Sequence, residues 1–344
     1  MMSESVACPA CFKSAAFETV ETHVDRVSGR EYRMLLCPIC GVYFSEPRQA
    51  VGPDWYEKAV PLRAQERHPA AESDWRFRRF FSEGLPPGRL LDVGCGDGGF
   101  LRLARERGYT PAGFDYEERM VALARARGIA DAECLEFGAY CRGRADGEFD
   151  FVTLFDVLEH APEPAAFLSE IRRLLKPGGY LAVTLPNALR PLPWGREEHD
   201  YPPHHFTRWT PQVLKQFLTD SGFLVVRVDA AHLMISPLAD HFYFNVLAPW
   251  FLGAARRLLF GRTAADAPLT TLYAVTCDGD AAPWGWRAGL RGALADKRLR
   301  QRLVDAFKFA CAPLSYCIAA VLALGYRCRR RDCGSMLYVL ARRQ

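Results

Sequence analysis

Short apolar runs alternate with segments of mixed polarity from residue 89 to residue 230. Apolar runs bounded by glycine, proline or acidic residues predict buried strands, and the segments between them predict helices. The expected strands span residues 90–93, 111–114, 132–137, 149–155, 180–185 and 223–228, with a last one at 335–341. The expected helices span residues 100–107, 118–127, 165–175 and 211–220, the last with Thr210 as its N-cap. This alternation predicts an α/β fold whose doubly wound, mostly parallel sheet carries helices on both faces.

Residues 231–333 interrupt this alternation with aromatic-rich stretches and the apolar run 309–326, which an arginine cluster follows. The run is near the lower length limit for a membrane span. A span would put the final strand on the opposite side of the membrane from the sheet that it completes, so we do not expect one. Two alternatives remain. The segment is a helical cap buried over the active site, or it makes peripheral membrane contact through residues 240–260 and 309–331, with the arginines on anionic headgroups.

Two Cys-Pro-x-Cys turns lie near the N-terminus, one made by Cys8 and Cys11 and the other by Cys37 and Cys40. Strand-like segments lie between them. Four thiolates at this spacing fit one tetrahedral zinc ion, and so small a module would draw its folding energy from the metal. Residues 1–45 are therefore predicted to form a zinc ribbon with a structural ion, because four thiolates leave no open coordination position. The alternative is four unligated cysteines.

Aromatic and basic residues dominate the stretch from 46 to 85, including Trp55, Tyr56 and the run 75–81. A helix with one aromatic face and one solvated face explains this mixture, so we expect a helical connector that packs on the next domain. An RNA-contacting surface of arginines and aromatics is the alternative.

Composition and charge narrow the function classes. The 344 residues are 49% hydrophobic and 24% charged, as in a globular protein with a sizeable core. The net charge of +4 is too small to argue for a nucleic acid partner. Residues 1–10 have neither a basic start nor an apolar core, so we expect no secretory signal. In the cytoplasmic setting that follows, paired cysteines bind metal rather than form disulfides.

A glycine-rich turn follows the first expected strand, where residues 90–100 read LLDVGCGDGGF. Its glycines would let backbone N–H groups approach a ligand closely before a helix begins. Gly94, Gly96 and Gly99 also satisfy the dinucleotide pattern G-x-G-x-x-G, so the glycines alone leave the cofactor open. Asp92 favours one cofactor, because a carboxylate there would repel a pyrophosphate but attract the ammonium and sulfonium groups of S-adenosylmethionine. Asp115, at the end of the second strand, can accept hydrogen bonds from ribose hydroxyls of either cofactor.

Three further motifs, together with this turn, resemble the class I S-adenosylmethionine-dependent methyltransferases: F-D-x-V at 149–152, D-V-L-E-H at 156–160 and L-K-P-G-G at 175–179. The resemblance covers residues 86–230 and the last strand, and it implies a Rossmann-like fold. By that resemblance Asp92 and the glycine turn bind the methionine moiety, and Asp115 binds the ribose. Leu135 lies beside the adenine, and residues 155–156 close the floor of the pocket. The implied cofactor-binding residues are Asp92, Gly94, Cys95, Gly96, Gly98, Asp115, Tyr116, Leu135, Phe155 and Asp156.

The sequence thus predicts four parts. They are a zinc ribbon (1–45), a helical connector (46–85), a methyltransferase core (86–230, completed by 334–344) and a hydrophobic helical insertion before the last strand (231–333).

Three histidines lie in loops at the expected ligand-binding edge of the sheet, His160 after the fourth strand and His204 and His205 after the fifth. Methyl transfer to a hydroxyl or an acidic carbon requires removal of a proton, and histidine is the natural base at neutral pH. We expect His205 to be the base. His160 is a second acceptor-side residue or a structural residue that fixes its loop, and His204 is the third candidate.

A narrower resemblance adds a substrate class. A zinc module, a class I domain and a His-Phe segment at 205–206 together are similar to the sugar C-methyltransferases of deoxysugar pathways and to methyltransferases of polysaccharide and cell-envelope biosynthesis. In the C-methylating enzymes a Glu-His pair precedes the aromatic residue and the histidine is the proposed base, a role that carries over to His205. This chain departs from that pattern in two ways. His204 occupies the position of the glutamate, although Glu197 and Glu198 lie upstream. The large C-terminal domain of those enzymes is not evident in the sequence. Both departures favour O-methylation over C-methylation.

We therefore expect an enzyme that uses S-adenosylmethionine and a structural Zn²⁺ ion to O-methylate a small-molecule or glycan acceptor, namely a sugar, sugar nucleotide or lipid-linked glycan intermediate. The respiratory-quinone methyltransferases, which share the core motifs and act on membrane-borne phenols, give the alternative. A non-catalytic S-adenosylmethionine-binding docking module and a nucleic-acid methyltransferase are further alternatives. The expected location is cytoplasmic. If residues 309–331 make membrane contact instead of forming a buried cap, the protein is peripheral on the inner face of the membrane.

Overall fold

The structure of the 344-residue chain is a computed structural model that describes residues 6–49, 55, 70–191, 196, 200–230, 235–247, 250, 297–329 and 334–344. The chain divides into two compact units. The first comprises Met1–Pro191, Arg196–His232 and Arg331–Gln344, and the second comprises Leu192–Gly195 and Leu233–Arg330.

A seven-stranded sheet forms the centre of the first unit, in the order β10-β11-β8-β7-β4-β5-β6. The strands are β4 (Arg89–Val93), β5 (Thr110–Asp115), β6 (Ala132–Cys134), β7 (Phe149–Phe155), β8 (Leu175–Pro186), β10 (Phe223–Ala230) and β11 (Met336–Arg343). β4 to β8 pair in parallel, and β11 lies antiparallel between β8 and β10. The strand order reverses at β4, which has β5 on one side and β7 on the other. Ligands of such sheets bind at the carboxyl ends of the strands beside this switch point.

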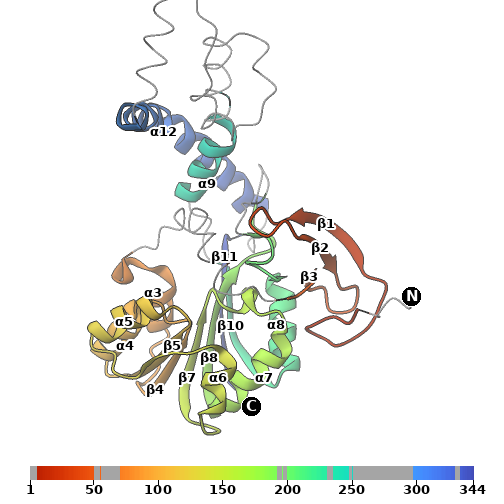
Figure 1. The fold of residues 1–344 in the computed structure, drawn as a ribbon, viewed down its shortest axis with the longest axis vertical. Helices are drawn as coiled ribbons and strands as arrows, with labels where there is room; N and C mark the ends of the chain where they lie inside the picture. The colour runs from red at the N-terminus through yellow and green to blue at the C-terminus, as the bar shows by residue number, and fades with distance from the viewer. Residues whose placement is uncertain are drawn as a thin grey trace, which may run out of the picture. The chain divides into compact units, whose positions relative to one another are not determined.

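Helices cover both faces of this sheet, as the alternation predicted (Figure 1). One face carries α3 (Trp75–Phe81), α4 (Gly99–Glu106) and α5 (Glu118–Ala126), and the other carries α6 (Phe137–Arg142), α7 (Pro164–Leu174) and α8 (Pro211–Asp220). Neighbouring residues of one strand pack into the hydrophobic cores on opposite faces of the sheet, because side chains alternate between the two faces. Leu90 of β4 packs with Phe80 and Leu101, whereas Leu91 packs in the core that includes Leu168 and Leu214.

Two local predictions were wrong. Residues 132–137 were expected to form one strand, but β6 ends at Cys134, because its partner β5 ends at the paired Asp115. Phe137 instead begins α6, where it contacts Phe167 of α7 with ring centroids 4.1 Å apart. The fifth strand was expected to span residues 180–185, after the Lys-Pro-Gly-Gly segment, but β8 begins at Leu175 and includes that segment. A register shift against β7 absorbs its extra residues.

The N-terminal strands β1 (Glu18–Val24), β2 (Glu31–Leu36) and β3 (Tyr43–Glu46) form a second, antiparallel sheet. Its fourth strand is β9 (Thr207–Arg208), which comes from the chain after β8. The strand-like segments expected between the two cysteine turns are confirmed as the β1–β2 hairpin, which turns at Gly29 with a positive φ of 71°. The pairing with β9 was not predicted.

In the expected connector, α3 and the short 3₁₀ helix η1 (Ala71–Ser73) are helical, and Asp74 caps α3 by accepting a hydrogen bond from the backbone N–H of Arg76. Residues 50–54 and 56–69 of that stretch, including Tyr56, lie outside the described residues.

The second unit contains α9 (Ile235–Phe242), the π-helical segment η4 (Tyr243–Leu247) and the long helix α12 (Lys297–Arg329). Leu238 and Ala239 pack against Ala319 and Ala323 of α12. Within α12, Phe309–Tyr326 has a mean hydropathy of 1.8 and is long and apolar enough to cross a membrane, and 17% of this window is buried. The expected helical character of residues 231–333 is confirmed for these segments, whereas residues 231–234, 248–249, 251–296 and 330–333 lie outside the described residues.

Candidate functional site

The glycine turn after β4 has a backbone that L side chains rarely adopt. Gly94, Gly96 and Gly98 have φ values of 69°, 52° and 74°. A Cβ at Gly98 would also come within 2.8 Å of the Cβ of Ala124. The N–H groups of Gly94 and its neighbour Cys95 both donate to the carbonyl of Phe114 at 3.0 Å. The turn is therefore held between β4 and β5, with its backbone open to close approach by a ligand.

Asp92 lies just before this turn and is 4% exposed. Its Oδ1 accepts a hydrogen bond of 2.6 Å from the hydroxyl of Thr153. Burial raises the pKa of Asp92 to about 7, more than the Thr153 hydrogen bond and the charge of Arg76 lower it. A cation bound beside this carboxyl would favour its charged form, so the residue fits the ammonium group of an amino-acid moiety.

Asp115 at the end of β5 is held by two backbone donors. Gly96 donates to its Oδ2 at 3.0 Å, and Glu117 donates to its Oδ1 at 2.9 Å. Each carboxylate oxygen keeps a further lone pair for a ligand hydroxyl. Tyr116, which follows, is 46% exposed, and the N–H of Leu135 donates to the carbonyl of Asp115 at 3.1 Å. Asp115, Tyr116 and Leu135 thus lie together at the carboxyl ends of β5 and β6, next to the glycine turn.

Asp156 at the end of β7 has a positive φ of 60° and is fixed from two sides. Its Oδ1 accepts from the Thr184 hydroxyl at 2.7 Å, and its Oδ2 pairs with Arg76 of α3. Phe155 packs edge-on against Phe100, with ring centroids 4.8 Å apart. Arg76 was not among the predicted site residues. Its position two residues after the capping Asp74 was the available signal.

The three candidate histidines meet at the carboxyl ends of β7 and β8. His160 ends the 3₁₀ helix η2 (Leu158–His160), and His204 and His205 lie in the loop before β9. One ring nitrogen of each lies within 4.8 Å of the others. Two contacts join the loops: His160 Nδ1 is 2.6 Å from the carbonyl of His204, and Phe206 N–H donates to the carbonyl of Glu159 at 2.8 Å. We call these three rings the three-histidine cluster.

The Asp200 carboxyl lies beside this cluster, and Glu159 immediately precedes His160 in the chain. His205 is buried, and its Nδ1 lies 3.7 Å from Oδ1 of Asp200, which pairs with Arg190. The acid facing His205 is thus Asp200, which sequence reasoning missed, whereas Glu197 and Glu198 lie outside the described residues. Glu159 is fully buried, and its carboxyl oxygens receive no hydrogen bond from the residues that the structure describes. Burial raises the pKa of Glu159 well above its usual range.

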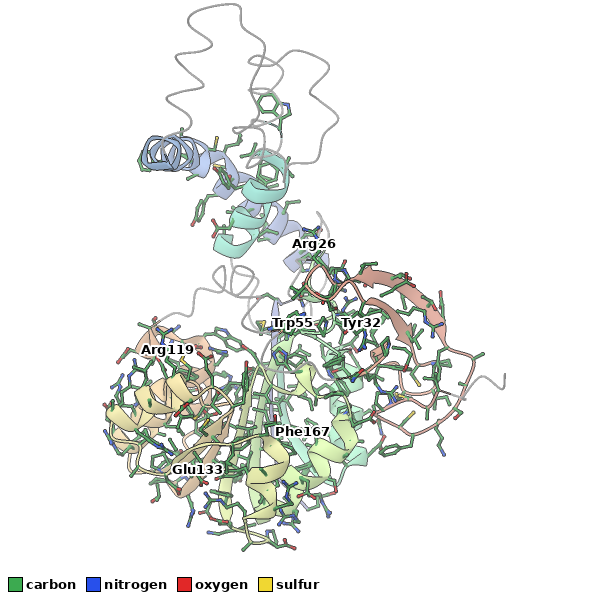
Figure 2. All side chains as sticks on the ribbon, viewed as in Figure 1. Arg26, Tyr32, Trp55, Arg119, Glu133 and Phe167 are labelled. Carbon is green, nitrogen blue, oxygen red and sulfur yellow. The ribbon has the colours of Figure 1, made fainter. Side chains whose placement is uncertain are left out.

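Trp55 brings an aromatic surface to the cluster. Its ring centroid lies 6.3 Å from that of His204, and its indole N–H donates to Asp25 at 3.0 Å. Figure 2 labels Trp55 beside the N-terminal hairpin. Trp55 thus contacts both the ribbon and the histidine loop.

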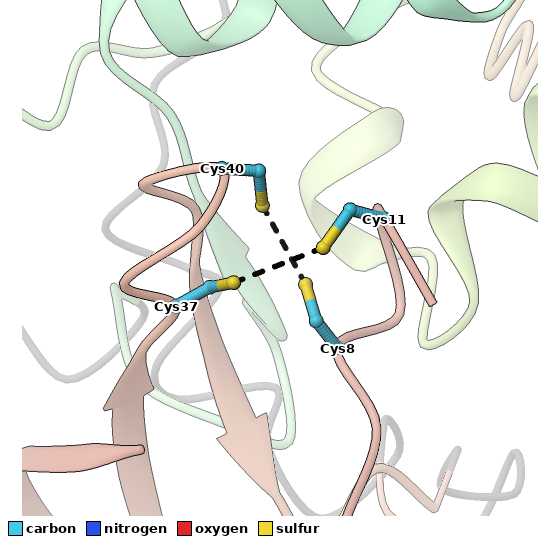
Figure 3. A group of neighbouring side chains, drawn as sticks. All are labelled: Cys8, Cys11, Cys37 and Cys40. Carbon is cyan, nitrogen blue, oxygen red and sulfur yellow. Dashed lines mark hydrogen bonds between the residues drawn. The ribbon is translucent and has the colours of Figure 1, made fainter. Parts of the chain in front are cut away.

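The four N-terminal cysteines converge on one point (Figure 3). Their sulfurs are 3.6 Å apart between Cys8 and Cys40 and 3.8 Å apart between Cys11 and Cys37. Zinc with four thiolates at 2.3 Å keeps its sulfurs about 3.8 Å apart, so the group fits a tetrahedral zinc ion. The side-chain hydrogen bond between Cys8 and Cys40 lowers the pKa of the Cys8 thiol to about 5 and raises the pKa of the Cys40 thiol. With all four positions taken by sulfur, such an ion would be structural.

The ribbon also supports the histidine loop. Tyr43 and Phe44 of β3 pair with Arg208 and Thr207 of β9, and Ser45 N–H donates to the carbonyl of Phe206 at 2.9 Å. Glu21 of β1 pairs with Arg208. The segment that follows His204 and His205, strand β9, is thus part of the ribbon sheet.

Known proteins resemble this chain over the core. Residues 64–228 match a family model described as a methyltransferase domain. A ubiquinone biosynthesis O-methyltransferase of Pseudomonas paraeruginosa is 30% identical over 178 residues, which are 46% of this chain and 73% of that protein. A protein of the same name from Pseudomonas aeruginosa is 32% identical over 108 residues, 30% of this chain and 47% of that protein. Among solved structures, an S-adenosylmethionine-dependent methyltransferase from Archaeoglobus fulgidus is 18% identical, with a TM-score of 0.49, and the match covers 83% of this chain and 99% of that one.

Proposed function

Because the chain belongs to the class I S-adenosylmethionine-dependent methyltransferases, we propose that it methylates a hydroxyl oxygen of an acceptor held at the three-histidine cluster. The observation that carries the proposal is the convergence of three imidazoles at the carboxyl edge of the sheet, where Asp92 is the penultimate residue of β4 and Asp115 ends β5. S-adenosylmethionine, when bound, supplies a methyl group on a sulfonium that is a good leaving group. The protein then has to align the partners and manage one proton.

The cofactor half of the site is built from the turn after β4 and its neighbours. We assign the ammonium group to Asp92, the ribose hydroxyls to Asp115 and the close backbone approach to Gly94, Gly96 and Gly98. Tyr116 and Leu135 border the adenine, and Phe155 with Asp156 closes the floor. The ion pair between Asp156 and Arg76 holds α3 against this end of β7.

The acceptor half is the three-histidine cluster. His205 is the residue that we assign to remove the hydroxyl proton, because it is buried and its Nδ1 faces the Asp200 carboxylate. A carboxylate at Nδ1 favours the tautomer in which Nε2 carries the lone pair. His160 and His204 complete the binding surface.

The acceptor that these features favour is a phenolic hydroxyl on an aromatic ring. The relatives are named for O-methylation in ubiquinone biosynthesis, and Trp55 offers an aromatic surface beside His204. A hydroxyl of a sugar or glycan intermediate is the second candidate, favoured by the four-cysteine ribbon whose sheet includes β9.

The apolar surface of α12 supports contact with a membrane. Phe309, Val321 and Leu324 are 85%, 72% and 65% exposed in the described residues. A membrane-borne acceptor and a peripheral attachment at the inner face of a cytoplasmic membrane would both use such a surface.

The proposal is tested with purified, zinc-loaded protein and labelled S-adenosylmethionine, offered substituted phenols and nucleotide sugars in parallel. We expect S-adenosylhomocysteine and methoxy product with the phenols. Product formation with the sugars alone would transfer the assignment to the second candidate. Absence of S-adenosylmethionine binding in calorimetry would overturn both.

A further inference from the structure

We propose that His160, His204 and His205 bind one divalent transition-metal ion, distinct from the ion of the four-cysteine site. The inference rests on the proposed function, since it states how the acceptor half of that site acts. The first observation is the spacing. One nitrogen of each ring lies within 4.8 Å of the others, and zinc held by imidazoles at about 2.0–2.1 Å keeps them about 3.3 Å apart. Ring movements of at most about 1.5 Å would close the difference.

The second observation is the orientation of two rings. His160 Nδ1 lies 2.6 Å from the carbonyl of His204, and a carbonyl only accepts, so Nδ1 carries the proton. His205 Nδ1 faces the Asp200 carboxylate at 3.7 Å. Both rings therefore present Nε2 as the donor nitrogen. Histidines that ligate a metal characteristically direct their other nitrogen at a carbonyl or a carboxylate in this way.

The third observation is the rigidity of the support. The loop of His204 and His205 is bonded to η2 through Phe206 and Glu159, and it continues into β9, which pairs with β3. Asp200, which orients His205, is 4% exposed and fixed by Arg190. A site whose ligands are held by backbone pairing and buried ion pairs is preorganised for an ion.

The donor set defines the chemistry. Imidazole nitrogens suit zinc, iron, nickel and copper rather than magnesium or calcium. Three protein ligands leave at least one coordination position open, unlike four thiolates. An acceptor hydroxyl occupying that position would lose its proton to solvent more readily, because the ion stabilises the oxyanion. During transfer the oxygen electron pair forms the bond to the methyl carbon, while the carbon–sulfur bond breaks and leaves a neutral thioether.

In this scheme His205 acts as a ligand instead of taking the proton itself, and the rest of the proposed function is unchanged. His205 as a metal ligand and His205 as the base predict different metal contents. They also predict different activities for protein that holds zinc only at the four cysteines.

The test uses the full chain. Protein is dialysed against a chelator of moderate strength, reloaded with Co²⁺ or Zn²⁺, and its metal content is measured by plasma mass spectrometry. We expect two equivalents in the wild type. One equivalent should show the charge-transfer absorption of cobalt bound to thiolates, and the other only ligand-field bands. The variants His160→Ala and His205→Ala should bind one equivalent, whereas His23→Ala, which removes a ring outside the cluster, should bind two. Circular dichroism and S-adenosylmethionine affinity report whether each variant is folded.

A single equivalent in the wild type, or a second equivalent that persists in both cluster variants, would overturn the metal site. If the wild type with one equivalent still methylates its acceptor and His205→Ala does not, the proposed function stands with His205 as the base. If the wild type does not bind S-adenosylmethionine, the proposed function fails whatever the metal count.

Discussion

Replacing Asp92 by asparagine should weaken cofactor binding and, without the cofactor, stabilise the fold. Asparagine has nearly the same shape, and its amide oxygen can still accept the hydrogen bond from Thr153, so the change removes the charge alone. Burial raises the pKa of Asp92 from its ordinary value of 3.8 to about 7. The free protein therefore loses stability as pH rises from about 4 to about 7, because the unfolded chain ionises this carboxyl first.

The magnitudes follow from that shift. About three pKa units correspond to about 4 kcal/mol of unfolding free energy, which is the most that Asp92→Asn can gain above pH 7 without cofactor. The affinity for the cofactor should instead rise with pH, because the ammonium group of the cofactor binds the ionised form of Asp92. At pH 6 about a tenth of the carboxyl is ionised and at pH 8 about nine tenths, so the wild-type affinity should rise about tenfold between them. Loss of a charge-assisted hydrogen bond in Asp92→Asn should cost about 1.5–3 kcal/mol of binding free energy.

Calorimetric titrations with S-adenosylmethionine and S-adenosylhomocysteine between pH 5.5 and pH 8.5, with thermal unfolding in parallel, measure both effects. Both ligands carry the ammonium group, so both should show the same pH dependence if Asp92 faces it. Asp97→Asn, a change of the same kind in the same turn at a half-buried carboxylate paired with Arg127, is the matched control. A variant Asp92→Asn with wild-type affinity, or with an undiminished rise in affinity between pH 6 and pH 8, would refute the reasoning.

Three further changes test other parts of the molecule. His205→Ala should lower kcat by about 10²–10⁴-fold and leave the Kd for S-adenosylmethionine within about twofold, measured by steady-state assay and calorimetry; equal losses in both would point to a folding defect. Arg208→Ala removes the buried arginine of β9 and its ion pair with the half-buried Glu21 of β1, so we expect a destabilisation of about 3 kcal/mol in denaturant unfolding and a lower kcat at unchanged cofactor affinity; unchanged turnover would show that the ribbon does not support the acceptor site. Phe309→Glu with Val321→Glu should abolish flotation with anionic liposomes while leaving cofactor affinity unchanged, and wild-type protein that stays at the bottom of the gradient would contradict the membrane proposal.

The sequence predicted the parts of the fold that depend on local pattern. The strands at β4 and β7 and the helix α8 with its Thr210 cap follow from apolar runs and capping chemistry, and they are confirmed. The four cysteines were predictable for the same reason, since their turns are short and repeat one motif.

The parts that escaped prediction depend on pairing between distant segments. Strand β9 has two residues and no periodicity of its own, so only its pairing with β3 defines it. Asp200 and Trp55 acquire their places near the histidines through that same tertiary arrangement. Strand β6 ends at Cys134 because β5 ends at its partner Asp115, and α6 begins shortly afterwards. The position of this boundary therefore depends on β5 and cannot be predicted from residues 132–137 alone.

The most direct test of the central claim is the identity of the methylated atom in a reaction with a substituted phenol and methyl-labelled S-adenosylmethionine, followed by carbon NMR of the product. The account predicts a methoxy carbon, formed in equal amount with S-adenosylhomocysteine, and its loss in His205→Ala. A methyl group bonded to carbon, or methoxy product formed at the wild-type rate by His205→Ala, would contradict it.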